Sequence, residues 1–149
     1  MEWVALVTWV LTAGGGFVLL AQWLAGGGMR QGRESGTRIR PWLILSHFLL
    51  AATGLVVWII YVATDKDSLA WVAFAILAFV ALLGWTMFAI WWQRRKRGAA
   101  VPGTDVAGGT SAGSEPAEQR FPVSIVTLHG ILAVTTVVLV FLTAVGVGD

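Results

Sequence analysis

The chain of 149 residues contains no cysteine, which excludes disulfides, thiolate zinc sites, iron–sulfur clusters and thioether-linked haem. Charge is also scarce: charged residues make up 12% of the chain, against about 25% in an ordinary soluble domain. Hydrophobic residues make up 57%, and the mean hydropathy is +0.79. This composition is that of an integral membrane protein.

Four apolar segments are long enough to cross a bilayer, which requires about 20 helical residues. They lie at about 3–25, 41–63, 69–92 and 121–147. Each must be helical, because lipid cannot satisfy the hydrogen bonds of the backbone. We therefore predict an all-α fold, an up-down bundle of four transmembrane helices that forms one integral membrane domain. Residues 98–119, rich in Gly, Ala, Ser, Thr and Pro, predict a flexible cytoplasmic linker.

Basic residues are distributed unevenly between the loops. Nine of the ten lie in the first and third loops, and Lys66 alone lies in the second. The positive-inside rule then places those two loops in the cytoplasm and both termini outside. Arginine outnumbers lysine, and Ala, Val and Gly are plentiful, which fits a GC-rich bacterial genome. We expect a multi-pass protein of the bacterial cytoplasmic (inner) membrane that contacts the lipid bilayer and binds no nucleic acid.

The two halves of the chain resemble each other. WVALVTWVLTA, which begins at Trp3, aligns with WVAFAILAFVA, which begins at Trp71, and the same register pairs Gly16 with Gly84. HFLLAATGLV and HGILAVTTVV align in the second helix of each half. The sequence therefore predicts two parallel helical-hairpin repeats, related by an axis along the membrane normal.

The only two histidines, His47 and His129, open the second pair of matched phrases. Measured from Pro41 and Pro122, each histidine lies roughly 10 Å into its helix. Because the second and fourth helices of an up-down bundle are diagonal partners, the imidazoles are expected to face each other at equal depth. Trp9 and Trp85, deeper in the first and third segments, are expected to fill the core.

A histidine inside a membrane is costly and indicates function by default. Three roles compete: axial ligation of one haem b, a proton relay, and structural hydrogen bonding between helices. The relay is weakened because no predicted span contains an interior Asp or Glu, and two nitrogens alone fall short of a closed zinc site. A haem iron that takes one imidazole on each face requires two opposed histidines at one depth, so we favour His47 and His129 as metal ligands.

A haem also requires space and cationic partners for its propionates. Small residues near the ligands are expected to supply the space; they are Gly16, Ala51, Gly84, Gly130 and Ala133. Three arginines lie about two helical turns before the histidines, on the cytoplasmic side, and are candidate propionate partners; they are Arg38, Arg40 and Arg120.

With His47, His129 and their small neighbours, the chain resembles the small four-helix membrane b-type cytochromes, which include cytochrome b561-like proteins and the haem-bearing membrane anchor subunits of succinate dehydrogenase. The resemblance implies one haem b and electron transfer, as a redox subunit and not as a stand-alone enzyme. It further implies exchange with quinone or a redox protein on the cytoplasmic side, or membership of a larger membrane complex. The alternative is a non-catalytic membrane subunit that stabilises or regulates a partner complex, with the two histidines as interhelical hydrogen-bonders.

Overall fold

A computed structural model describes residues 1–31, 39–99 and 117–147. The long helices are α1 (Glu2–Ala25), α3 (Pro41–Thr64), α4 (Asp67–Ala99) and α5 (Val123–Ala144). Two short helices, α2 (Gly28–Gln31) and η1 (Ala117–Arg120), lie in the connections. All four long helices are long and apolar enough to cross a membrane. This result confirms the prediction of an all-helical, multi-pass membrane protein.

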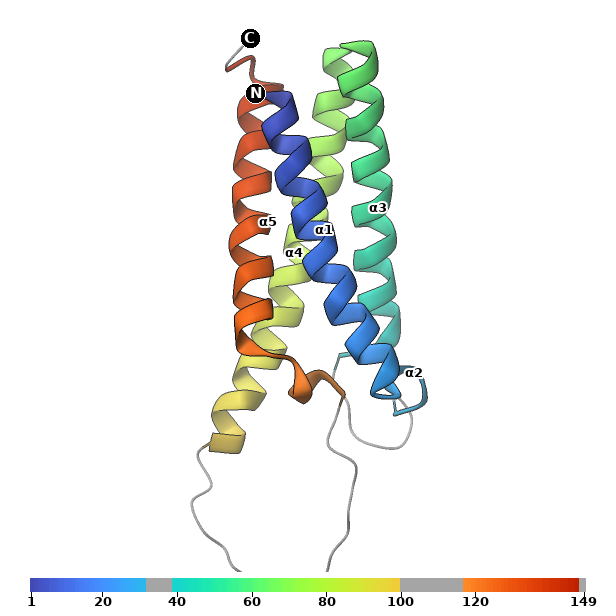
Figure 1. Ribbon diagram of the computed structural model, residues 1–149, viewed down its shortest axis with the longest axis vertical. Coiled ribbons are helices and arrows are strands. Elements are labelled where there is room, and N and C mark those ends of the chain that lie inside the picture. Colours follow the sequence, from blue (N-terminus) through green and yellow to red (C-terminus); the bar gives the residue numbers. More distant parts are fainter. Residues whose placement is uncertain (32–38, 100–116, 148–149) are drawn as a thin grey trace, which may run out of the picture.

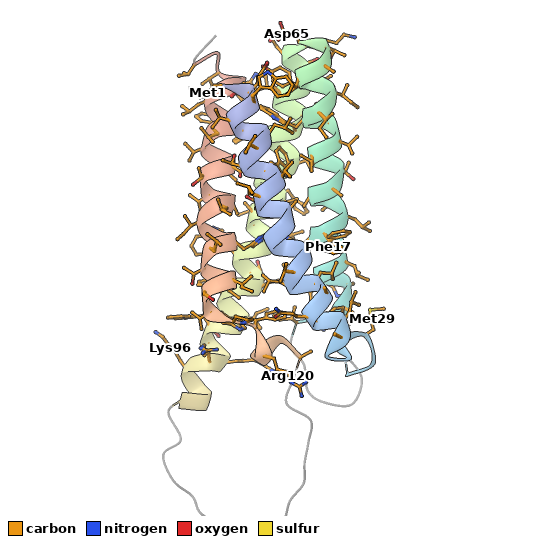
Figure 2. All side chains as sticks on the ribbon, viewed as in Figure 1. Met1, Phe17, Met29, Asp65, Lys96 and Arg120 are labelled. Atoms are coloured by element: carbon orange, nitrogen blue, oxygen red, sulfur yellow. The ribbon has the colours of Figure 1, made fainter. Side chains whose placement is uncertain are left out.

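Figure 1 shows a four-helix bundle with both chain termini at the same end. In it, α1 and α4 each pack against both α3 and α5. The helices α3 and α5 are therefore diagonal partners, as expected for an up-down bundle. We call the end that carries Met1 and Asp65 the terminal end, and the opposite end, with Lys96 and Arg120, the basic end (Figure 2).

The helix boundaries follow from local chemistry. Pro41 is the first residue of α3, where its missing N–H costs least, whereas Pro122 is the residue that caps α5. Asp65 ends α3 in the left-handed conformation, with φ of 53°, and the two-residue connection Asp65–Lys66 then turns the chain into α4. At the basic end α4 extends beyond the predicted boundary at 92, to Ala99, because arginine and lysine favour helix.

The predicted linker, 98–119, falls largely outside the described residues. Its described edges are helical, since Ala99 ends α4 and Ala117 begins η1. Ala117 is buried, and a Cβ atom added to Gly26 would lie 2.9 Å from the Ala117 Cβ. The backbone at Gly28 lies directly against the indole of Trp23, which is almost fully buried. These contacts hold the described short helices α2 and η1 against α1 at the basic end of the bundle.

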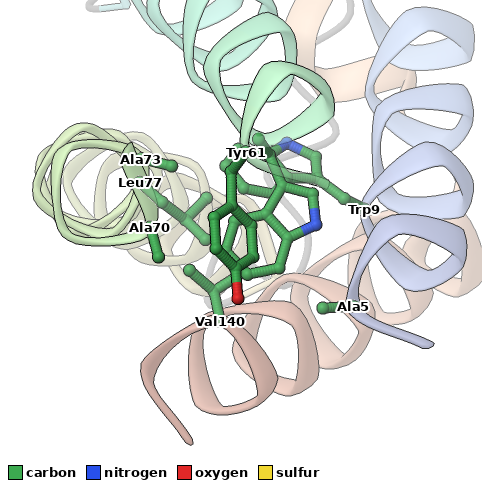
Figure 3. Close-up of a cluster of buried hydrophobic side chains, with 8 residues drawn as sticks. Ala5, Trp9, Tyr61, Ala70, Ala73, Leu77 and Val140 are labelled. Atoms are coloured by element: carbon green, nitrogen blue, oxygen red, sulfur yellow. The ribbon is translucent and has the colours of Figure 1, made fainter. Parts of the chain in front are cut away.

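The interior near the terminal end is filled by aromatic side chains (Figure 3). The ring centroids of Trp9 and Trp58 are 6.2 Å apart, and those of Trp58 and Tyr61 are 4.8 Å apart. Small side chains on the neighbouring helices leave room for these rings; they are Ala5, Ala70 and Ala73. Trp9 is 2% exposed, which confirms its predicted place in the core, but Trp85 is 61% exposed, so that prediction was wrong for Trp85.

Candidate functional site: two facing histidines

Each histidine is held by a neighbouring helix. His47, on α3, lies against Gly84 of α4, where an added Cβ would come within 3.2 Å of His47 Cε1. The same ring bonds through Nδ1 to the carbonyl oxygen of Val80, at 3.1 Å. Glycine at position 84 therefore lets the imidazole approach the backbone of α4 closely enough to reach a carbonyl one turn earlier.

His129, on α5, makes the same two contacts with α1. A Cβ added to Gly16 would lie 3.0 Å from His129 Cε1, and His129 Nδ1 lies 2.9 Å from the carbonyl oxygen of Thr12. Thr12 precedes Gly16 by one helical turn, as Val80 precedes Gly84. The matched glycines were expected to make room beside the histidines. What occupies that room is the histidine ring itself.

The two imidazole rings face each other across the diagonal of the bundle. Their centroids are 6.4 Å apart, and their planes are inclined by 66°. Two imidazoles that share one metal through bonds of about 2 Å, with about 1.1 Å from each nitrogen to its ring centroid, have centroids roughly 6 Å apart. The observed separation of 6.4 Å is close to that value.

The backbone partners determine which nitrogen of each ring is available. A carbonyl oxygen only accepts hydrogen bonds, so His47 Nδ1 and His129 Nδ1 must carry the hydrogen. In the neutral imidazole, Nε2 then bears the lone pair. Neither Nε2 has a hydrogen-bond partner among the described residues. In that part of the chain, Trp58 Nε1 is the one completely buried side-chain atom without a partner. Each Nε2 therefore keeps an unused lone pair and is not completely buried.

A threonine pair supports the His129 side of the site. Thr12 Oγ1 lies 3.1 Å from Oγ1 of Thr136, which is fully buried on α5. Thr136 also donates to the carbonyl oxygen of Leu132, at 2.8 Å. The pair joins α1 to α5 at Thr12, the residue whose carbonyl oxygen also bonds to His129. The sequence offered one signal for Thr12, since it stands in the repeat register of Val80, but nothing marked either carbonyl as a histidine partner.

The other predicted site residues divide into those beside the histidines and those apart from them. Ala51 and Ala133 are half-buried, one helical turn beyond His47 and His129 on the same helix faces. Gly130 is exposed, and a Cβ added there would meet no atom within 4 Å, so this glycine points away from the histidine pair. The expectation that Gly130 makes room beside the ligands finds no support in its position.

The candidate propionate partners lie at the basic end. Arg40 caps the start of α3, Arg120 ends η1, and both side chains are exposed. Along α3, Arg40 is roughly 10 Å from the level of His47. Arg38 lies outside the described residues. Neither Arg40 nor Arg120 is a hydrogen-bond partner of an imidazole, and both lie at the basic end, on the side of the bundle toward which α3 and α5 begin.

The ligand set within the described residues is limited to the histidine pair, because no group of three or more His, Cys, Asp or Glu side chains comes together there. Two neutral nitrogens fit an axial pair better than a tetrahedral site. Neither a protein-family model, nor a curated protein, nor a solved structure matches the chain. Function is therefore inferred from the geometry of these residues.

Proposed function

We propose that the protein is a small b-type cytochrome that binds one haem b between α3 and α5, with His47 and His129 as the axial ligands. The observation that carries the proposal is the facing pair of rings, with centroids 6.4 Å apart and both Nδ1 atoms bonded to backbone carbonyls. Interhelical hydrogen bonding alone does not require the two rings to lie so close together across the bundle.

The residues around the histidines prepare them as ligands. An N–H donated to a carbonyl fixes the orientation of an imidazole and makes its other nitrogen more basic. Val80 and Thr12 supply these carbonyls, and Gly84 and Gly16 let the rings reach them. When bound, haem b supplies reversible one-electron transfer. Arg40 and Arg120, with Arg38, supply positive charge for the propionates at the basic end.

The matched contacts support an origin of the fold in two parallel repeats. The histidine of each half packs against a glycine and bonds to a carbonyl oxygen of the other half. The two glycines, and the two residues that supply the carbonyls, are aligned with each other in the repeat. The positive-inside rule places the basic end in the cytoplasm and both termini outside, in a bacterial cytoplasmic membrane. The haem site then lies nearer the cytoplasmic face.

The packing toward the terminal end supports electron exchange on the cytoplasmic side. There the interior is occupied by Trp9, Trp58 and Tyr61, and the chain has no histidine beyond the facing pair. A second haem, as in the two-haem cytochrome b561-like proteins, has no ligands here. We therefore propose that quinone or a redox protein exchanges electrons at the cytoplasmic side, with the chain acting as a subunit of a larger redox complex.

The second candidate function is that of a non-catalytic membrane subunit that stabilises or regulates a partner complex. It is favoured by one observation: both Nδ1 hydrogen bonds join different helices, α3 to α4 and α5 to α1. Such bonds are worth about 1 kcal/mol each in a membrane. This reading gives no role to the two Nε2 atoms.

A difference spectrum, dithionite-reduced minus oxidised, tests the proposal in the purified full-length chain. Wild-type protein should show a sharp b-type α-band. His47→Asn and His129→Asn keep a donor near the position of Nδ1 but remove the ligand nitrogen, so each should lose the band while the helices remain packed. A protein that stays colourless after haem supplementation, or Asn variants that keep the band, would reject the haem site.

A further inference from the structure

We propose that the part of α4 that projects at the basic end binds an anionic phospholipid of the adjacent leaflet, with the lipid phosphate at Arg95 and Lys96. This proposal does not depend on haem. Figure 1 shows the last turns of α4 extending beyond the ends of α1, α3 and α5. Figure 2 places Lys96 at the same end as Met29 and Arg120. These turns of α4 therefore emerge from the bundle at the membrane boundary.

One face of this part of α4 is a continuous aromatic strip. Trp85 meets Phe88 edge to face at 5.8 Å, and Phe88 stacks on Trp92 at 6.0 Å with an interplanar angle of 20°. Trp85 is 61% exposed and Trp92 42%, so other helices leave the strip uncovered. At about 1.5 Å per residue, the face from Trp85 to Lys96 is roughly 16 Å long. That length suits the upper part of an acyl chain and its headgroup.

Two cations follow the strip, Lys96 over its last ring and Arg95 over the buried ring of Trp91 beside it. The Lys96 ammonium lies 5.5 Å from the ring centroid of Trp92, and the Arg95 guanidinium lies 5.5 Å from that of Trp91. Among the described residues, these indole rings are the only recorded partners of the two cations. The rings restrict the long side chains before any ligand arrives, which lowers the entropy lost on binding. Both charges remain uncompensated by a carboxylate there.

The order of apolar and charged residues along α4 matches a phospholipid, with its phosphate at the two cations. The aromatic part of the face lies on the membrane side and the cations on the aqueous side, which is the order of acyl chain and phosphate in a phospholipid. A net negative headgroup, as in phosphatidylglycerol, matches the two charges, whereas zwitterionic phosphatidylcholine does not. Tryptophan at this depth adds an interfacial anchor.

Native mass spectrometry of the detergent-purified full chain tests the site, with phosphatidylglycerol and phosphatidylcholine as the added lipids. Wild-type protein should retain phosphatidylglycerol in preference to phosphatidylcholine. In the double variant Arg95→Gln/Lys96→Gln, the affinity for phosphatidylglycerol should fall about tenfold or more, because each cation near an anionic headgroup strengthens binding. The charge-matched control Arg30→Gln/Arg33→Gln, in the connection between α1 and α3, should keep it.

Trp92→Leu provides a second test, because it keeps every charge and removes the ring beneath Lys96. It should weaken phosphatidylglycerol binding even if the double glutamine variant fails to fold. Equal losses in the two double variants would show diffuse electrostatic attraction and overturn the proposed site. Unchanged binding in Arg95→Gln/Lys96→Gln or in Trp92→Leu, or equal retention of the two lipids by the wild type, would overturn it as well.

Discussion

His129 lies so close to Gly16 that a Cβ atom on this glycine would come within 3.0 Å of His129 Cε1. The same relation holds between His47 and Gly84, at 3.2 Å. In each case the absence of a side chain on one helix lets an imidazole of another helix reach a backbone carbonyl. The two halves of the protein are thus joined reciprocally at the candidate site, and several consequences can be measured.

Gly16→Ala should displace the His129 ring and lower the stability of the bundle by about 1–3 kcal/mol, the usual cost of overpacking. It should also weaken or shift the b-type spectrum of the proposed haem. Gly14→Ala, in the same helix, is the matched control, because a Cβ there meets no atom within 4 Å. Replacing this helical glycine should raise stability by up to about 1 kcal/mol. Thermal unfolding in detergent measures whether the two variants change stability in opposite directions. An equal change in both would contradict the close contact between Gly16 and His129.

Thr136→Val should remove the hydroxyl contact with Thr12 and destabilise the protein by about 0.6 kcal/mol, the mean found for such bonds between membrane helices. Its isosteric shape leaves packing intact. Thr135→Val is the control, because Thr135 is exposed and donates only to the carbonyl of Ile131 in its own helix. The melting temperatures of the two variants test this prediction. A fall in melting temperature for Thr135→Val as large as that for Thr136→Val would argue against the interhelical contact.

Trp58→Phe should change stability by less than about 1 kcal/mol, although Trp58 is fully buried. Its Nε1–H has no hydrogen-bond partner in the structure, so the loss of packing is offset by removal of an unsatisfied donor. Trp58→Ala removes the whole ring and should cost about 3–5 kcal/mol. Thermal unfolding of the two variants tests this difference. A Phe variant as unstable as the Ala variant would show that the N–H has a partner, such as an internal water.

Arg40→Gln and Arg120→Gln should each lower the midpoint potential of the proposed haem, because a nearby positive charge favours the reduced state. The expected shift is on the order of tens of millivolts, where about 59 mV corresponds to a tenfold change in a one-electron equilibrium. Lys66→Gln, in the connection at the terminal end, should leave the potential unchanged. Spectroelectrochemical titration measures all three, and a shift in Lys66→Gln alone would contradict the placement of the arginines.

The sequence alone predicted the four apolar helices, because a segment in lipid must satisfy its own backbone hydrogen bonds and must be long enough to span. It also predicted the matched depth of His47 and His129, since position along a helix is proportional to residue number. The diagonal placement of their helices followed from the up-down connectivity. These features depend on length, order and hydropathy, which the sequence states directly.

Only the tertiary structure decided which way each residue of a helix faces. A membrane helix is apolar on all sides, so its pattern does not distinguish the face in the core from the face in lipid. Gly16 therefore meets His129 whereas Gly130 points away, and Trp9 is buried whereas Trp85 is exposed. The choice of Thr12 and Val80 as histidine partners was likewise decided by packing, because every residue carries the same carbonyl group and only the neighbouring glycine makes one accessible.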